Sequence, residues 1–445
     1  MPPAKNECRH KVLQLNPSPF APLAGYTQPT PQKRAAAVPT SDKSVKNAVL
    51  ELAQSFPAPL VLPHDELNYD PDDPPQSVKE WLHMDSRNDM SPKYGRDTIY
   101  IGRVPTFQKK VEFMRDWTTP IIDSPLQLQD VSSPDADLFV DYLKTFYHGM
   151  KVKILPTSLS WTTWGAKSSQ PRRKANLPKY IGLAHGTQCT RIRVRNAPDG
   201  AFTAQLNLDD IIDAAIAMLP ADAYAICLLV DHDIHESDED DFCCGRAYGG
   251  SRVSVVQTAR YNPLLDLREG IDRAHMWPLS HCKDFVDELC AVEDVLPKPA
   301  TKQQVAMSKS GAMRAAVDAA VVNTDSLDSA QALWFSRLAR TVSHELGHCF
   351  GIAHCVYFAC NMQGTAGMKE DVRQPPYLCP MCEAKVCHAI VGELQNGGEQ
   401  EKRTWTKERC VSTRDFCARL QDVDMQIAMW RGLGAWSTAR LETLP

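Results

Sequence analysis

Three histidines and a glutamate lie close together in one segment of the chain. Residues 344–355 read His-Glu-Leu-Gly-His-Cys-Phe-Gly-Ile-Ala-His-Cys. On a helix, His344 and His348 project from the same face because they are four residues apart. Both imidazoles can therefore bind one zinc ion, which lowers the pKa of a coordinated water toward neutrality. Glu345 follows the first of these histidines and can accept a proton from that water as a general base.

A third ligand is expected a few residues further along the chain. Hydrolytic zinc sites usually have three protein ligands and leave one position for water. Gly351 permits the positive φ at which the helix would end, and the chain could then return His354 to the metal. A His-Glu-x-x-His segment alone also occurs on ordinary surface helices. The addition of Gly351 and His354 at this spacing favours a catalytic zinc site over that alternative.

Four cysteines follow as two close pairs. Cys355 and Cys360 form the first pair, and Cys379 and Cys382 form the second. Four thiolates in this arrangement suit a tetrahedral structural zinc. Such a site would fix the loop that begins after the active-site helix, and would thereby hold His354 in place.

Other interpretations of these cysteines stay open. Cys387 or His388 could replace one of the four ligands. The Cys-x-x-Cys segment could be a redox pair, although no thioredoxin-like strand precedes it. Cys355 could be a nucleophile, although no neighbouring residue is a dedicated base for it. Cys349 lies inside the expected helix and is predicted to be a packed side chain.

The composition limits the class of protein. The chain has 445 residues, of which 43% are hydrophobic, and a formal net charge of −5. A general nucleic-acid binder usually carries a basic excess, so neither the chain nor its cysteine-rich segment is expected to bind nucleic acid. No apolar run is long enough to span a bilayer, and the first residues do not resemble a secretory signal. We therefore expect a cytoplasmic or nuclear protein with no membrane partner, whose cysteines are thiols or metal ligands.

The zinc motif requires a helix, and the spacing of apolar residues predicts one over residues 329–350. Strands are predicted at 98–104, 152–155, 190–194, 223–230, 242–248 and 252–260, and further helices at 135–148 and 206–219. The run 223–230 is almost wholly apolar, which suits a strand buried on both faces. Residues 163–188 are polar and basic and are predicted to form a loop. Strands that alternate with helices indicate an α/β fold with a largely parallel sheet.

The composition also suggests three regions. Residues 1–94 are rich in proline, and we expect them to be largely disordered with one short helix over residues 44–56. Residues 95–390 form the expected catalytic domain, which carries an insertion at 262–328. Residues 391–445 are expected to be a C-terminal helical extension.

Together these residues resemble the archaemetzincins, a family of zinc peptidases in the metzincin clan. The family pattern is His-Glu-x-x-His-x-x-Gly-x-x-His-Cys, four residues, Cys-x-Met and a later Cys-x-x-Cys, and residues 344–382 contain each part of it. The resemblance implies a metzincin-like zincin domain with a twisted, mostly parallel sheet, an antiparallel edge strand, an active-site helix and a zinc-stapled C-terminal subdomain. Residues 242–248 look like the edge strand that binds substrate in this clan.

The resemblance also implies a role for each motif. It implies a catalytic zinc on the three histidines with Glu345 as general base, and a structural zinc on the four cysteines, which makes two zinc ions per chain. Met362 would be the Met-turn residue beneath the catalytic zinc. Two features depart from the family pattern. Thr365 follows Gly364 where the family usually has serine, and the 262–328 insertion is longer than a compact member needs.

The resulting hypothesis is a zinc metallopeptidase that hydrolyses peptides or small proteins. The resemblance implies aminopeptidase-like action on short peptides. The alternative is a catalytically weak, zinc-stabilised protein- or peptide-binding module, which the presence of Glu345 disfavours. Tyr261 and Tyr357 are candidates for stabilising the oxyanion. His232 and His235 follow the 223–230 strand among acidic residues and are predicted to belong to a solvated loop. The sequence gives no indication of the oligomeric state.

Overall fold

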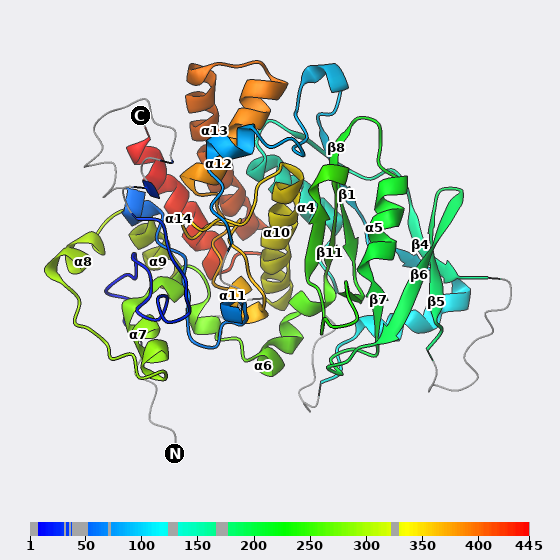
Figure 1. Cartoon of the computed structure of the whole chain (residues 1–445), viewed down its shortest axis with the longest axis horizontal. Coiled ribbons are helices and arrows are strands. Elements are labelled where there is room, and N and C mark those ends of the chain that lie inside the picture. The colour runs from blue at the N-terminus through cyan, green and yellow to red at the C-terminus, as the bar shows by residue number, and fades with distance from the viewer. Residues whose placement is uncertain are drawn as a thin grey trace.

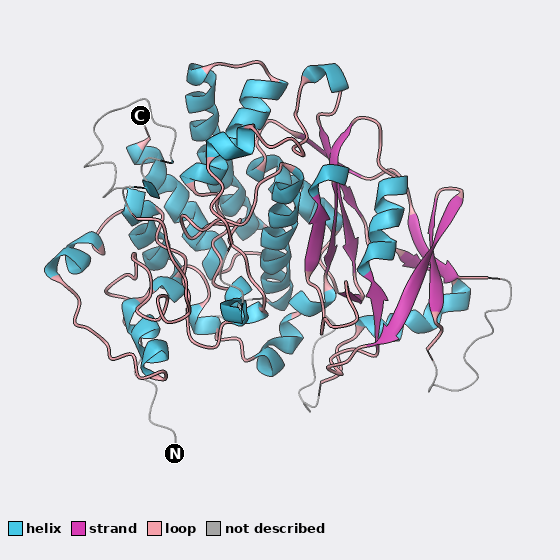
Figure 2. Ribbon diagram, viewed as in Figure 1, coloured by secondary structure: helices cyan, strands magenta, loops and turns pink. Residues whose placement is uncertain are grey.

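A long helix, α10 (Ala330–Cys349), stands between a five-stranded sheet and a group of helices (Figure 1). The computed structural model describes residues 8–30, 33–34, 37, 52–69, 73–122, 132–165, 177–321 and 329–444. Strands and helices are largely separated onto two sides of the molecule (Figure 2). None of the helices within these ranges combines the length and the apolar character needed to cross a membrane.

The five-stranded sheet has the order β10-β11-β8-β1-β3. Its members are β10 (Gly245–Tyr248), β11 (Val253–Gln257), β8 (Ala223–Val230), β1 (Thr98–Gly102) and β3 (Lys151–Ile154). All neighbouring pairs are parallel except β10 with β11, which is antiparallel. The expectation of a mixed α/β fold with a largely parallel sheet is therefore confirmed, and the antiparallel strand lies at an edge.

The central strand β8 divides its side chains between two cores. Cys227 and Leu229 pack in the core shared with α10, whereas Ile226 and Leu228 pack in a second core with helix α5 (Leu208–Ala217). Successive side chains of a strand point to opposite faces, so both faces of β8 are buried. This explains the uninterrupted apolar run in the sequence, because a strand covered on both sides has no polar face.

A second sheet of six strands lies beyond α5 and was not predicted. Its order is β2 (Thr106–Phe107), β4 (Leu159–Thr163), β5 (Tyr180–His185), β6 (Gln188–Asn196), β7 (Ala204–Asn207) and β9 (Asp233–His235). The prediction of a loop over 163–188 is wrong at residues 180–185, which pair with both β4 and β6. Most side chains of β6 are at least partly exposed, so its apolar signal is weak.

The remaining α-helices mostly cover the other side of α10 (Figure 1). They are α3 (Val78–Leu82), α4 (Ala136–Phe146), α6 (Asp266–Glu269), α7 (Lys283–Ala291), α8 (Lys302–Met307), α9 (Ala312–Val321), α11 (Met368–Asp371), α12 (Pro380–Cys387), α13 (Glu399–Asp422) and α14 (Ala428–Thr443). Helices α9 and α14 lie close together: a Cβ added at Gly432 would be 3.2 Å from the carbonyl oxygen of Ala316.

The C-terminal helices share a buried ionic contact with α12. The Glu383 carboxylate accepts hydrogen bonds from Arg409 Nη1 at 2.9 Å and from Arg440 Nη1 at 3.1 Å. All three residues are buried. Since Phe416 of α13 and Trp430 of α14 also join the core around α10, both helices are integral to that core.

The described parts of the proline-rich N-terminal region are packed, which its composition did not suggest. Leu13 and Leu15 are buried, and the amide of Gln14 donates to the carbonyl of His281 at 3.0 Å. Trp81 is fully buried, and its Nε1 donates to the carbonyl of Phe350 at 2.8 Å. A few large apolar residues suffice to anchor these segments on a body formed by later residues. Most of the short helix expected at 44–56 lies outside the described residues, and the division into three regions stays a prediction.

Candidate metal and active site

The C-terminal half of α10 has one face in the core and one face toward a cleft. Leu338, Val342 and Leu346 are fully buried on the core side. The helix ends as its sequence predicts: Gly351 has φ of 75°, the left-handed conformation that glycine adopts without steric cost. Its amide donates to the carbonyl of His348 at 2.9 Å, and the chain then turns back toward the helix.

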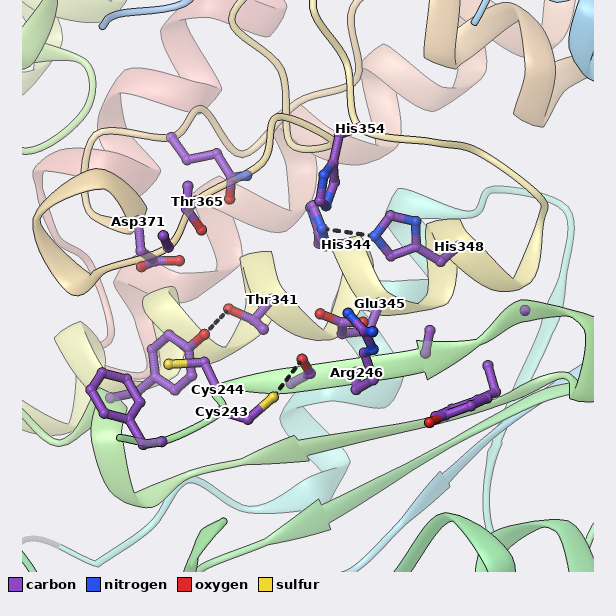
Figure 3. A pocket seen from close by; sticks show the side chains of 18 of the residues that line it. Cys243, Cys244, Arg246, Thr341, His344, Glu345, His348, His354, Thr365 and Asp371 are labelled. Carbon is purple, nitrogen blue, oxygen red and sulfur yellow. Dashed lines mark hydrogen bonds between the residues drawn. The ribbon is translucent and has the colours of Figure 1, made fainter. Parts of the chain in front are cut away.

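This turn brings the three predicted histidine ligands together (Figure 3). One ring nitrogen each of His344, His348 and His354 lies within 4.8 Å of those of the other two. The Nε2 atoms of His344 and His348 are 3.0 Å apart. The arrangement therefore has the convergence that a shared metal ion requires.

Each histidine is also anchored through its other ring nitrogen. Nδ1 of His344 is 2.7 Å from the carbonyl oxygen of Asn361, and Nδ1 of His348 is 2.7 Å from that of Ile352. Nδ1 of His354 is 3.1 Å from a carboxylate oxygen of Asp73. These oxygens only accept hydrogen bonds, so each Nδ1 must be the donor. Metal-binding histidines are commonly fixed in this way.

Because Nδ1 carries the hydrogen of each neutral ring, Nε2 carries a lone pair and no hydrogen. The nitrogens of His344 and His348 therefore face each other at 3.0 Å without a hydrogen between them. A cation bound by both would relieve this repulsion. Burial lowers the pKa of His344 well below its usual value and that of His348 to about 4, so both rings are neutral and able to bind a metal. The residues thus fit zinc.

Glu345 lies on the same helix and faces strand β10. Its side chain is buried, and burial raises the pKa of its carboxyl to about 7. A Cβ added at Gly245 would be 3.1 Å from Oε1 of Glu345, so the strand passes directly beside the carboxylate. A second close approach follows at Gly249, where an added Cβ would be 2.4 Å from the carbonyl oxygen of His348. The two glycines let β10 and its following turn lie against α10.

Met362 packs beneath the turn of α10 that carries the first two histidines. It is fully buried, and a Cβ added at Gly347 would be 2.4 Å from its Sδ. The carbonyl of Met362 accepts from the amide of Cys355 at 2.7 Å. This contact holds the 361–362 backbone beside the segment that carries His354. The family resemblance implies that Met362 is the Met-turn residue.

The four predicted cysteine ligands form a compact buried cluster. The sulfurs of Cys355, Cys360, Cys379 and Cys382 all lie within 4.8 Å of one another. Cys360 Sγ accepts from the amides of Met362 at 3.5 Å and Cys379 at 3.2 Å. The other three thiols hydrogen-bond to Cys355 and hold its pKa well below the usual value. The cluster has the ligand set of a structural zinc site.

The alternative ligands of the sequence prediction lie elsewhere. Cys387 directs its thiol toward the carbonyl of Lys402 at 3.7 Å. His388 has its Nε2 3.7 Å from Glu393. Neither belongs to a candidate metal group within the part of the chain that the structure describes.

The histidines open onto a cleft with a volume of about 730 Å³. One wall is β10 with α10, and the opposite wall includes residues 365–368. Arg246 of β10 extends beside Glu345 (Figure 3) and forms an ion pair with Glu236 at 3.1 Å. Tyr261 lines the cleft, whereas Tyr357 does not belong to its lining. The Tyr261 hydroxyl accepts from Thr341 at 2.7 Å.

Two polar residues of the site were missed in the sequence. Arg246 lies within the expected edge strand 242–248, and that position was the available signal for it. Asp73 carries no such signal, because it reaches His354 only through the fold. The prediction of a solvated loop for His232 and His235 is wrong: both are buried, and His232 Nε2 is 3.2 Å from the carbonyl oxygen of Met114.

Comparison with known proteins agrees with this site. The model of peptidase family M54 matches residues 311–388, which include both ligand sets. Archaemetzincin-2 of Rattus norvegicus is 24% identical over 250 residues, which are 56% of this chain and 52% of that protein. Archaemetzincin-1 of Homo sapiens is 35% identical over 85 residues, which are 18% of this chain and 17% of that protein. The matched region thus spans about half the length of the archaemetzincin-2 relative.

Solved structures of archaemetzincins are also similar in part. The protein of Methanopyrus kandleri is 14% identical with a TM-score of 0.31, over 67% of this chain and 98% of that chain. The protein of Archaeoglobus fulgidus, complexed with malonate, is 14% identical with a TM-score of 0.29, over 65% and 99%. The family model and the sequence relatives agree with each other, and both confirm the resemblance of this chain to the archaemetzincins, peptidase family M54.

Proposed function

We propose that the chain is a zinc metallopeptidase with two zinc ions, one catalytic and one structural. The resemblance to the family implies zinc. His344, His348 and His354 would hold the catalytic ion, and the four-cysteine cluster would hold the structural one. The observation that carries the proposal is the partly buried pair of Nε2 atoms at 3.0 Å, each left with a lone pair by a carbonyl at Nδ1.

The structural ion would support the catalytic site. Asn361, whose carbonyl orients His344, lies between Cys360 and Met362 in the chain. Cys355 directly follows His354. A tetrahedral zinc on the cysteines would fix the backbone on both sides of the catalytic ligands, as a zinc-stapled subdomain of a metzincin-like fold does.

The neighbouring side chains have the chemistry that peptide hydrolysis needs. Zinc supplies a Lewis acid that polarises a carbonyl and lowers the pKa of water. Glu345 would accept the proton of the attacking water and pass it to the leaving amine. Arg246 would place positive charge on the same side of the cleft, where it could stabilise a developing oxyanion. The Tyr261 hydroxyl accepts from Thr341 and keeps its own proton, so it would be a second donor for that oxyanion.

Strand β10 offers a binding edge for an extended peptide. Among the described residues it pairs with β11 alone, so its other edge is open toward the cleft. A substrate backbone could hydrogen-bond along this edge as an added strand and thereby lie beside Glu345. Aminopeptidase-like cleavage of short peptides is the finer part of the proposal and follows from the family resemblance.

Zinc content and peptide cleavage test the proposal together. We expect Glu345→Gln to keep the zinc of the wild type and to lose cleavage by roughly 100-fold or more, because proton transfer contributes that much. His348→Ala and Cys379→Ser should each lose one zinc ion. Cys387→Ser and His388→Ala are matched controls, since both residues follow Cys382 closely in the sequence but lie outside the ligand set, and they should lose none.

The substrates are a peptide library with free or acetylated N-termini, and products are identified by mass spectrometry. Aminopeptidase-like action would spare the acetylated peptides. Cleavage by Glu345→Gln at the wild-type rate would refute the proposed mechanism. Peptide binding without cleavage by the zinc-loaded wild type would favour the alternative, a zinc-stabilised binding module.

A further inference from the structure

A mixed group of cysteines and histidines lies outside the two sites described above. Cys8 and His10 belong to the N-terminal segment, whereas His275 and Cys282 belong to the 262–328 insertion. Cys8 Sγ is 2.9 Å from Cys282 Sγ and 3.4 Å from His10 Nδ1. One ligand atom each of Cys8, His10 and His275 lies within 4.8 Å of the other two. Cys8 thus links the two imidazoles to the thiol of Cys282.

His275 has the anchoring typical of a metal ligand. It ends the 3₁₀ turn Arg273–His275, and its Nδ1 is 2.7 Å from a carboxylate oxygen of Asp272. Its ring stacks on Phe285 with centroids 4.1 Å apart and an interplanar angle of 7°. The other ring nitrogen, Nε2, is buried and makes no hydrogen bond within the described chain. A carboxylate on Nδ1 and a free lone pair on Nε2 are what a metal-bound histidine shows.

His10 is held in an unfavourable backbone conformation. Its φ is 47°, in the left-handed region that residues with a Cβ seldom adopt. Its carbonyl accepts from Arg314 Nη1 at 2.7 Å. The residues after it are also fixed, since the amide of Lys283 donates to the carbonyl of Val12 at 2.9 Å and the amide of Leu13 to Ser308 Oγ at 2.8 Å. The strained turn keeps His10 and Cys8 on the insertion.

We propose that Cys8, His10, His275 and Cys282 form a further zinc site, separate from the two of the proposed function. Two thiolates and two imidazoles are a ligand set that zinc prefers, and two thiolates balance its charge. The cysteines are not joined by a disulfide. Asp284, whose carboxylate lies within 4.8 Å of both sulfurs, adds negative charge at the exposed side of the cluster.

This site would give the insertion a structural role. The ion would join the N-terminal segment to the 3₁₀ turn and to Cys282, the residue before α7. These parts lie more than 260 residues apart in the sequence, as the separation of 274 between Cys8 and Cys282 shows. Because a zinc site contributes its binding energy to folding, its loss would release the N-terminal segment from the body.

The test uses the full-length protein and compares zinc content with a matched control. The double variant Cys8→Ser with His10→Ala should carry one zinc ion fewer than Cys290→Ser, which removes a buried cysteine of α7 outside the cluster. His275→Gln, which leaves the N-terminal segment intact, should lose the same ion. Far-ultraviolet circular dichroism would verify that the variants fold.

A second readout identifies the ligands. Cobalt bound in place of zinc should give thiolate charge-transfer absorption. One part of this absorption should disappear in Cys8→Ser, and the separate part that comes from the four-cysteine cluster should disappear in Cys379→Ser. The difference between variants is one ion whether or not the two-site proposal holds, so the two proposals fail separately. Equal zinc content in all variants would overturn the inference, as would a Cys8–Cys282 disulfide in protein whose thiols were blocked at lysis.

Discussion

The contact between Gly347 and Met362 makes Gly347→Ala a sharp test of how the histidines are positioned. The added Cβ would lie 2.4 Å from Sδ and 2.9 Å from Cε of Met362, which is fully buried. Overpacking of this kind costs about 1–3 kcal/mol. Alanine is a better helix former than glycine by up to ~1 kcal/mol, which offsets part of that cost. We therefore expect a net loss of stability of about 1–2 kcal/mol.

The same substitution should loosen the first histidine. If Met362 moves, the adjacent carbonyl of Asn361 moves with it, and His344 loses part of its anchor at Nδ1. The assay is urea unfolding of the zinc-loaded protein together with zinc competition by a chelator. Orienting partners of a ligand typically change metal affinity about 10-fold or more, and we expect an effect of at least that size.

Two further variants isolate the contact. Gly392→Ala is a matched control in the helical turn His388–Leu394, where the added Cβ would meet no atom closer than 3.4 Å, and it should be neutral or slightly stabilising. In a Met362→Ala background the clash is absent, so Gly347→Ala should cost nothing there. A single Gly347→Ala variant with wild-type stability and zinc affinity would refute the reasoning.

Three other perturbations test separate parts of the structure. Asp73→Ala should weaken zinc binding at His354 by roughly 10-fold, which is the lower end of such effects because the Asp73–His354 pair is about one-third exposed. Asp73→Asn should weaken zinc binding less. Chelator competition measures both variants, and an unchanged zinc affinity would contradict the anchoring role. Glu383→Gln leaves Arg409 and Arg440 buried without a counter-charge, and it should lower the free energy of unfolding in urea by about 3 kcal/mol. A loss near zero would show that the contact is dispensable. Burial lowers the pKa of His235, so below the ordinary histidine pKa of about 6.5 the unfolded chain binds a proton that the folded chain resists. The free energy of unfolding should therefore fall as the pH decreases through that value. His235→Gln should reduce this fall between about pH 7.5 and about pH 5.5.

Helix α10, which carries His344, Glu345 and His348, was predictable because the sequence pattern that specifies it is local. Apolar spacing along residues 329–350, the four-residue separation of the first two histidines and the glycine at 351 are all properties of one segment, and the structure has the helix at Ala330–Cys349. Strand β8 was predictable for the same reason, since a strand buried on both faces has an unbroken apolar sequence. The wider set of metal ligands remains a proposal.

Features that depend on distant contacts were not predictable in this way. Strand β5 has no strong pattern of its own and is fixed by pairing with β4 and β6. Asp73 reaches His354 from a segment 281 residues away. The order of the N-terminal region likewise comes from its packing on residues such as His281. The proline-rich composition contains no information about these long-range contacts, so it could not predict that the region is packed.

The close approach of β10 to α10 has a consequence for how the cleft can evolve. A methyl group added at Gly249 would collide with the carbonyl oxygen of His348, and one added at Gly245 would press on the Glu345 side chain at 3.1 Å. The spacing between strand and helix at this wall is fixed, because a bulkier residue at either glycine would displace Glu345 or His348. The opposite wall at residues 365–368 consists largely of loop and contributes no metal ligand, so its side chains are less constrained. Selectivity among peptides should therefore diverge on the loop wall, while the strand wall stays constant wherever the chemistry is retained.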